Sequence, residues 1–374
     1  MFKWDEILQS KVLRYYGSCL ALIHVITSYL FSSYRIDDLA RESAFPICYP
    51  GLEGCEHWRF FSSPELRNLM ILYGAFAIAT IAAFISERFK KIAPLMLLGL
   101  CVFKLILQLS DYRIATNYHF LAQVITFVFL IVPQRIATIS ILLPGVYFCA
   151  GLLKLNVDWL SGDTLIKPSI IQGPLLSALL VYVLVLEIFI VWFIFSNKKA
   201  IRLAVLLQLI AFHIYSWHIV DYPYPSFMFC ILGFFVLTLN YDYKIKENLP
   251  RFATIMGLLC LFQLTPYLFA KDPGLDGRSR ILSLNMMDVK SVCERQIELT
   301  TAEGMTSFKI PIDIKRPRML CDPQVTKEIA RHYCERTIIP GTMKVFQQSR
   351  RSTEKDFKEI LNYSLQCPGP SHGS

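Results

Sequence analysis

The sequence predicts an all-α polytopic membrane protein with about nine transmembrane helices, followed by a small, disulfide-prone extracytoplasmic α+β tail. Residues 1–270 are apolar and aromatic with short charged breaks, whereas residues 271–374 are ordinary polar sequence. Only 18 % of the 374 residues are charged, against about a quarter in a soluble domain, and the mean hydropathy is +0.43. We therefore expect a helical bundle in the membrane over 1–270 and a separate domain over 271–374.

Nine apolar runs approach the length of about 20 residues that a membrane-spanning helix needs. They lie near 17–33, 69–86, 93–110, 118–132, 136–152, 175–196, 202–219, 226–240 and 252–270. Only four residues, 132–135, separate the fourth run from the fifth, which predicts a tight helical hairpin. In the tail, apolar alternation over 308–312 predicts a strand, and helical periodicity predicts helices over 325–333 and 355–365.

The basic residues of the short loops predict the orientation, because Lys and Arg collect on the cytoplasmic side. With the N-terminus inside, ten basic residues fall in inner loops: Arg88, Lys90, Lys91, Arg135, Lys198, Lys199, Arg202, Lys244, Lys246 and Arg251. The outer loops hold three: Arg113, Lys154 and Lys167. Nine spans then place the tail outside the cytoplasm, and we expect the inner membrane of a bacterium.

The cysteines agree with this orientation. Five lie in apolar runs and are expected to pack as small hydrophobic residues: Cys19, Cys101, Cys149, Cys230 and Cys260. Six lie in segments assigned outside and are candidates for disulfides: Cys48, Cys55, Cys293, Cys321, Cys334 and Cys367. Cys48 and Cys55 are expected to staple the first outer loop. The four tail cysteines allow three pairings, between which the sequence does not decide.

Placing an ionisable side chain at membrane depth costs free energy, so such a residue is a candidate for a functional site. Lys154 ends the apolar run 136–152, and burial disfavours the charged form of an amine, which would make it usable as a base. The alternative is an interfacial lysine with Asp158 as its i+4 partner and Trp159 in the aromatic belt.

Two other polar positions lie in or beside apolar runs. His119, which follows Asn117 and Tyr118, is predicted at the outer start of the fourth helix, as a proton carrier, a ligand partner or an ordinary interfacial residue. Glu187 is central in its run and should face the bundle interior, in a functional or a structural role.

The stretch 212–225 is rich in Tyr, Trp and His, and it reads as a cap on the outer mouth of a cavity or as an aromatic belt. His213, Tyr215 and His218 are its candidate site residues. His213 and His218 are five residues apart and share a helix face poorly, so no two-histidine metal site is indicated. We predict no metal anywhere in the chain, since no Cys/His ligand spacing occurs.

Several of these residues lie in segments that resemble a known protein family. The segment Phe148-Cys-Ala-Gly-Leu-Leu-Lys154-Leu-Asn-Val-Asp158-Trp159-Leu-Ser-Gly162 resembles the A-G-x-x-K-L-x-x-D-W-x-x-G signature of vitamin K-dependent γ-glutamyl carboxylases. These enzymes and their bacterial relatives share the horizontally transferred transmembrane (HTTM) domain. Asn117-Tyr118-His119 and Phe212-His213 followed by Ser226-Phe227-Met228 resemble two further segments, and Glu187 falls where the family has an acidic residue. The resemblance covers about residues 10–270.

The resemblance implies a lyase that uses reduced vitamin K or another lipid quinol to carboxylate glutamate in a secreted peptide. Lys154 would be the base and His119 its supporting partner. Asn117, Asp158, Trp159, Glu187, His213, Tyr215 and His218 would line the cofactor site or cavity. Two features depart from the animal enzymes: Leu153 replaces the first of two adjacent lysines, and about 100 cysteine-containing residues replace a large extracytoplasmic domain.

Two alternatives stay open beside this enzyme. One is a non-redox membrane factor for maturation or export of a secreted peptide, which the small cysteine-containing tail favours. The other, ranked last, is a transporter, because no paired Gly/Pro-broken helices occur in matching halves. The bilayer and a secreted peptide are the expected partners. Nucleic acid is not expected despite the net charge of +9, because no basic stripe with interleaved aromatics occurs.

Overall fold

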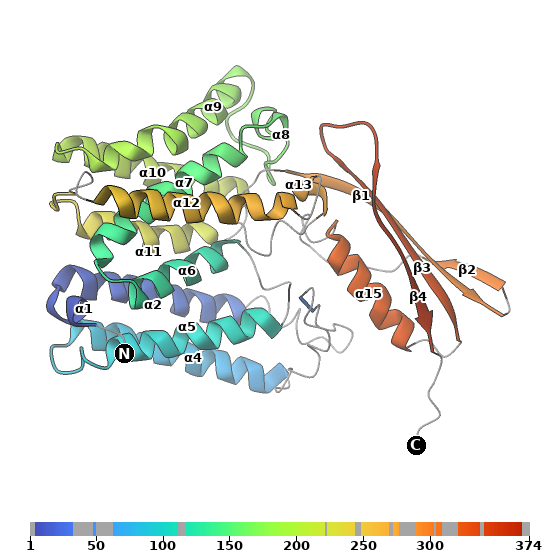
Figure 1. Cartoon of the computed structure of the whole chain (residues 1–374), viewed down its shortest axis with the longest axis horizontal. Helices are drawn as coiled ribbons and strands as arrows, with labels where there is room; N and C mark the ends of the chain where they lie inside the picture. Colours follow the sequence, from blue (N-terminus) through green and yellow to red (C-terminus); the bar gives the residue numbers. More distant parts are fainter. Residues whose placement is uncertain are drawn as a thin grey trace.

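The computed structural model describes residues 4–32, 48–49, 63–110, 112, 117–220, 223–243, 248–268, 272–276, 289–302, 304–308, 321–336 and 340–368. Helices of the bundle lie roughly side by side, and the tail extends from one end of it (Figure 1). The bundle comprises α1 (Asp5–Gln9), α2 (Lys11–Leu30), α4 (Ser63–Ile85), α5 (Ala93–Ser110), α6 (Asn117–Ile131), α7 (Arg135–Leu153), α8 (Val157–Leu160), α9 (Pro174–Ile188), α10 (Lys199–Val220), α11 (Tyr224–Leu237) and α12 (Leu249–Leu264). Two 3₁₀ segments, η4 (Ile190–Phe195) and η6 (Thr265–Leu268), extend α9 and α12, and the short α13 (Pro273–Asp276) leads to the tail.

Each of the nine predicted runs coincides with one of these helices. By length and apolar composition, four stretches in the described part of the chain qualify as membrane spans: Arg67–Ile85, Arg135–Leu153, Lys199–Ile219 and Leu249–Leu268. Four shorter apolar helices accompany them: Ala93–Leu109, Asn117–Ile131, Pro174–Ile188 and Tyr224–Leu237. The chain is therefore a helical membrane protein, and the number of nine spans is not confirmed.

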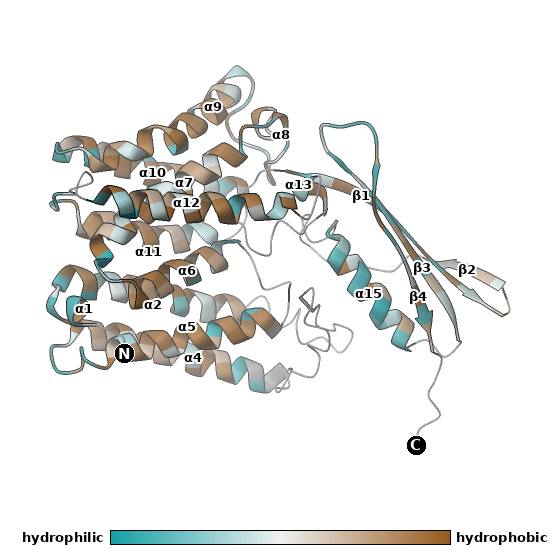
Figure 2. Ribbon diagram, in the orientation of Figure 1, coloured by the Kyte–Doolittle hydropathy of each residue, from teal (hydrophilic) through white to brown (hydrophobic). Residues whose placement is uncertain are grey.

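The helices of the bundle are predominantly hydrophobic (Figure 2). Large side chains such as Leu72, Leu95, Phe193 and Leu261 are exposed on its helices. A soluble protein rarely exposes so continuous an apolar surface. Such a surface is compatible with lipid. A helix also suits lipid because its backbone N–H and C=O groups form hydrogen bonds within the helix.

The predicted hairpin between the fourth and fifth runs is present as the turn between α6 and α7. Gln134 adopts a left-handed backbone conformation there, with φ 52°. The next residue, Arg135, is buried, and its guanidinium donates hydrogen bonds to the carbonyls of Phe129 and Leu130 and pairs with Glu6 at 3.0 Å. The arginine thus satisfies carbonyls at the end of α6 while tying α1 to this end of the bundle.

In its described residues the tail is a four-stranded antiparallel sheet with helix α15 (Pro323–Arg336) packed against it. Its strands are β1 (Ser291–Thr301), β2 (Gly304–Phe308), β3 (Gly341–Arg351) and β4 (Lys358–Cys367), in the order β2-β1-β3-β4. Alternate residues of β3, including Met343 and Val345, are buried, as the period of two along a strand requires. This α+β tail matches the predicted class, and α15 confirms the helix predicted over 325–333.

The helix predicted over 355–365 is wrong, because this segment contains strand β4. Leu361, Tyr363 and Leu365 recur every second residue and pair with β3 at Gln347, Val345 and Met343, respectively. The spacing of Leu361 and Leu365 fits one helical turn as well as two strand steps, so periodicity alone did not separate the two structures. The strand predicted over 308–312 meets β2 only at Phe308, and residues 309–312 lie outside the described residues.

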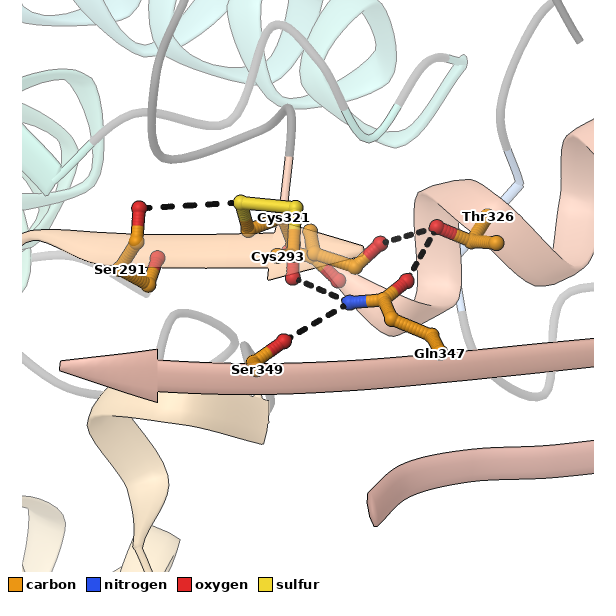
Figure 3. Close-up of a disulfide and its surroundings, with 7 residues drawn as sticks. Ser291, Cys293, Cys321, Thr326, Gln347 and Ser349 are labelled. Atoms are coloured by element: carbon orange, nitrogen blue, oxygen red, sulfur yellow. Dashed lines mark hydrogen bonds between the residues drawn. A yellow bond between two sulfur atoms is a disulfide. The ribbon is translucent and has the colours of Figure 1, made fainter. Parts of the chain in front are cut away.

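Two disulfides settle which of the three tail pairings occurs. Cys293 pairs with Cys321, and Cys334 pairs with Cys367. The first staples β1 to the start of α15 and lies beside a buried amide, Gln347 (Figure 3). The Gln347 side chain donates to the Cys321 carbonyl at 2.8 Å and accepts from the Thr326 hydroxyl at 2.6 Å. Cys48 is also disulfide-bonded, whereas Cys55 lies outside the described residues.

The five cysteines of the apolar runs are free thiols. Cys101, Cys149 and Cys230 are buried, as expected of packing residues, whereas Cys19 is half-buried and Cys260 is exposed.

Candidate functional site

The most deeply buried ion pair of the described residues joins α7 to α9. Lys154, the residue that follows α7, places Nζ 2.5 Å from Oε1 and 2.6 Å from Oε2 of Glu187. Both side chains are almost entirely inaccessible, at 2 % exposure each. Two polar positions singled out separately by the sequence therefore form one unit, and Glu187, not Asp158, is the partner of Lys154.

Gly151 makes this approach of the two helices possible. A Cβ atom at this position would lie 2.7 Å from Cγ1 of Ile188 and 3.0 Å from Cβ of Glu187, closer than real Cβ atoms approach other groups. The glycine of the A-G-x-x-K segment thus lets α9 pack directly on the last turns of α7. Lys154 comes three residues after Gly151. The close contact of α7 and α9 at Gly151 therefore brings the Lys154 ammonium within reach of the Glu187 carboxylate.

The remainder of the signature builds α8, a single turn at the end of the bundle that contacts the tail. The Asn156 side chain accepts a hydrogen bond from Trp159 N at 2.9 Å, which caps this turn. Trp159 is buried, donates from Nε1 to the Leu180 carbonyl at 3.1 Å, and lies with its ring 5.2 Å from Lys154 Nζ. Gly162 ends the segment at a φ of +81°, a conformation that glycine adopts without strain.

A second pair of polar side chains adjoins the first. Tyr147 and His213 share a hydrogen bond of 2.6 Å between the phenol oxygen and Nε2. The charge of Lys154 acts electrostatically on His213, and that of Glu187 acts on Tyr147, so the two pairs are neighbours. The Phe212 ring lies 5.8 Å from Lys154 Nζ. Within the described part of the chain, the buried Nδ1 of His213 has no hydrogen-bond partner.

Asp158 binds the tail and not Lys154. It is buried, pairs with Nη1 of Arg351 at 2.8 Å and accepts a hydrogen bond from the hydroxyl of Thr353. Arg351 also contacts Asp272 through Nη2 and Nε, at 2.8 and 3.0 Å. We call Asp158, Asp272, Arg351 and Thr353 the tail clamp. It holds the turn between β3 and β4 against α8, which begins three residues after Lys154.

The ionisation of the tail clamp follows from this geometry. Burial would raise the pKa of Asp272, but the hydrogen bonds and charge of Arg351 outweigh it and hold that pKa below its ordinary value. Burial acts in the opposite sense on Arg351, and the two carboxylates nonetheless raise the pKa of the guanidinium. Asp272 and Arg351 are therefore both charged at neutral pH.

His119 lies in a different part of the bundle. It is fully buried, and its ring packs against Phe31, Tyr118 and Phe227 at centroid distances of 5.3, 4.5 and 4.9 Å. These ring contacts and the contacts of Lys154 have no residue in common in the described ranges. The structure thus gathers Lys154, Glu187, Trp159 and His213, while His119 belongs to an aromatic cluster with α2 and α11.

The remaining predicted cavity residues lie at the edge of this arrangement. Asn117 is half-buried at the start of α6. Tyr215 is half-buried and forms a hydrogen bond with Ser169. His218 is exposed, whereas His213 is buried, as the spacing of five residues between them predicts.

Sequence reasoning missed two buried ionisable residues, His24 in α2 and Lys104 in α5. Each interrupts an apolar run, which is the same signal that identified Glu187. His24 forms a hydrogen bond with Tyr73, and Lys104 lies 5.1 Å from the ring of Phe227. Both side chains are almost fully buried.

Among the residues that the structure describes, no group of three or more His, Cys, Asp or Glu is arranged to hold a metal ion. Comparison of the chain with protein-family models, with curated proteins and with solved structures finds no match.

Proposed function

We propose that this chain is a membrane enzyme related to the vitamin K-dependent carboxylases, in which the Lys154–Glu187 pair handles protons for a reaction driven by a lipid quinol. The observation that carries the proposal is the buried pair itself. An ion pair inside a membrane bundle is costly and is a functional-site candidate by default. Lys154 also lies in the segment that resembles the carboxylase signature, and Glu187 falls where that family has an acidic residue.

The residues around the pair fit a flat, lipid-soluble aromatic group. Trp159 and Phe212 flank Lys154 Nζ at 5.2 and 5.8 Å, and Tyr147 and Tyr224 adjoin His213. The unsatisfied Nδ1 of His213 supplies a buried polar atom for a hydroxyl or carbonyl group. When bound, a lipid quinol would supply, through oxygenation by O2 to an epoxide and water, the strong base that removes a glutamate γ-proton before CO2 adds.

The chain itself contributes a proton acceptor and a fixed charge. Transfer of one proton from Lys154 Nζ to Glu187 leaves both groups neutral, and the free amine then accepts a proton from a bound hydroxyl group. The hydrogen bond between Tyr147 and His213 orients the imidazole beside the pair. Because the site is closed to water by Trp159 and α8, these charges act in a low dielectric.

The proposal includes an orientation. The tail and its disulfides lie at the end of the bundle that holds Lys154, whereas Arg14, Arg135 and Arg251 contact loops at the opposite end. Disulfides persist in oxidising compartments. We place the tail on the extracytoplasmic side and the N-terminus in the cytoplasm, in a bacterial inner membrane, with a secreted peptide as substrate.

The test uses the full chain in nanodiscs supplied with reduced vitamin K, oxygen, labelled CO2 and a glutamate-containing peptide. Quinol epoxide and label in the peptide are measured separately. The variant Lys154→Met/Glu187→Leu replaces the ion pair by apolar groups, and Lys199→Met, at an exposed inner position, is the control. We expect the double variant to lose about 10²-fold or more of both activities. Equal activity of the wild type and the double variant in both assays would refute the proposal.

One observation favours the non-redox maturation factor as a second candidate. In the described residues β4 pairs only with β3, so its other edge is open to a further strand. An extended peptide can bind such an edge through main-chain hydrogen bonds. Peptide binding that is unchanged in Lys154→Met/Glu187→Leu, together with no quinol turnover in the wild type, would support this candidate over the enzyme.

A further inference from the structure

Helix α5 contains a buried lysine that the proposed reaction does not use. Lys104 lies in the second half of this apolar helix and is 1 % exposed, whereas Val102, Leu105 and Ile106 beside it are exposed. Its side chain therefore enters the bundle while the opposite face of α5 meets the surroundings. No snorkelling to the end of the helix accounts for it.

Unlike the buried cations Arg14, Arg135 and Lys154, Lys104 has no carboxylate partner among the described residues. Its Nζ lies 5.1 Å from the centroid of the Phe227 ring and close enough to His24 to interact electrostatically. No carboxylate pairs with Lys104, and no hydrogen bond reaches Nζ, in the part of the chain that the structure describes. A ring face compensates an ammonium group much less than a carboxylate does.

Polar side chains from two neighbouring helices lie near this lysine. Gln123 of α6 donates from Nε2 to the carbonyl of Cys101, one turn from Lys104, at 2.6 Å. The Oε1 atom of Gln123 is buried and has no donor among the described residues. His24 of α2, which interacts electrostatically with Lys104, shares a hydrogen bond with Tyr73 of α4. Among the described residues the cluster thus combines one cation with hydrogen-bonding groups and no carboxylate.

From this juxtaposition we infer that Lys104 anchors a second buried site, which binds a small monocarboxylate. A single buried ammonium group is balanced by a single negative charge, and a carboxylate accepts hydrogen bonds from ammonium and neutral donors together. A dianion such as phosphate would be left undercompensated by one cation. The carboxylate can arrive as bicarbonate from water or as the head of a fatty acid from the bilayer, and both present the same planar group.

This site is separate from the Lys154 site. Lys104 contacts Phe227 and His24, whereas Lys154 contacts Glu187, Trp159 and Phe212. The inference therefore stands whether or not the chain oxygenates a quinol, and binding at Lys104 can be measured without any turnover.

The test measures thermal unfolding of the full chain in nanodiscs of neutral phospholipid. Sodium bicarbonate, sodium decanoate and sodium chloride are titrated separately at constant ionic strength. Wild type is compared with Lys104→Met, which keeps the length of the side chain without the charge, and with Lys199→Met as the matched exposed lysine. Equilibrium retention of the radiolabelled carboxylate by the wild type is measured in parallel, so the result does not depend on the folding of a variant.

We expect a saturable rise in the midpoint temperature of the wild type and of Lys199→Met with a carboxylate but not with chloride. Lys104→Met should bind at least about tenfold more weakly, because it lacks the charged hydrogen-bond donor. A response to bicarbonate alone identifies the aqueous source, and a response to decanoate alone identifies the lipid. Equal responses of wild type and Lys104→Met, or no retention of either carboxylate by the wild type, would overturn the inference.

Discussion

Lys154 and Lys104 are both lysines buried in apolar helices, and the comparison between them shows how differently a bundle treats the same side chain. Lys154 meets a carboxylate from a neighbouring helix at 2.5 Å. Lys104 meets the face of an aromatic ring at 5.1 Å and no carboxylate in the described residues. The protein itself neutralises the charge of Lys154 with the carboxylate of Glu187. For Lys104 we propose that a bound anion, which is not part of the protein, does the same.

The physical difference lies in what remains after one group is removed. Deleting one member of a buried ion pair strands the other charge at a large desolvation cost. Deleting a cation that has no ionic partner leaves no unpaired charge buried in the protein. The two lysines should therefore respond oppositely to the same substitution.

The largest expected effect comes from Lys154→Met. Loss of the ammonium leaves Glu187 buried without its cation, which should destabilise the protein by about 3–5 kcal/mol. Lys104→Met should cost little or should stabilise, when no carboxylate is added. Thermal unfolding of both variants in nanodiscs checks this pair of outcomes, and adding Glu187→Leu to Lys154→Met should restore most of the loss. Similar losses of stability in Lys154→Met and Lys104→Met would contradict the expected difference between the two lysines.

A smaller effect is expected from Arg351→Met, which opens the tail clamp. Asp158 would lose a charged hydrogen bond in a buried position, at a cost of about 1.5–3 kcal/mol. Limited proteolysis should then release the tail faster, and hydrogen exchange should increase in α8 near Lys154 but not in α5 near Lys104. The exposed Arg336→Met serves as the control. Unchanged proteolysis would mean that the clamp does not hold the tail.

Gly151→Ala probes the close packing that only the Lys154 site needs. The added methyl group would meet Ile188 and Glu187 at 2.7 and 3.0 Å, which should cost about 1–3 kcal/mol. Gly257→Ala is the matched control, because nothing lies within 4 Å of its Cβ and alanine favours a helix by about 1 kcal/mol over glycine. Opposite signs in thermal unfolding are expected; a stabilising Gly151→Ala would show that α7 and α9 can move apart freely.

The smallest effect is the acid response of the tail clamp. The folded-state pKa of Asp272 is lowered, so its contribution is present above the ordinary aspartate value of about 4 and is lost as pH falls through the folded pKa. Tail release by an acid-stable protease should therefore rise below about pH 4 in the wild type. Asp272→Asn should weaken this dependence, and an identical pH profile in both proteins would argue against it.

Much of the membrane region was predictable because the signals there are local. A helix in lipid satisfies its own backbone, so each apolar run became a helix close to the expected bounds. Lys154, Glu187 and His213 were recognisable one by one as polar groups in apolar sequence. Their grouping was not, since it depends on how α7, α9 and α10 pack. Lys104 was equally recognisable and was overlooked.

The tail was less predictable for the opposite reason. The spacing of Leu361 and Leu365 suits a helix and a strand alike, and pairing with β3 decided between them. The four tail cysteines were correctly expected to form disulfides, but three pairings were equally consistent with the sequence. Only the approach of β1 and β4 to α15 selects Cys293–Cys321 and Cys334–Cys367.

The sequence by itself determined that this is a helical membrane protein with a cysteine-rich polar tail, because apolar run length and composition act within each segment. Tertiary structure decided which buried charge has a partner. Glu187 is more than thirty residues from Lys154 along the chain, and Gly151 brings the two together. Asp158, four residues from Lys154, pairs instead with Arg351 of the tail. Electrostatic interactions depend on distance in space, and that distance is a property of packing.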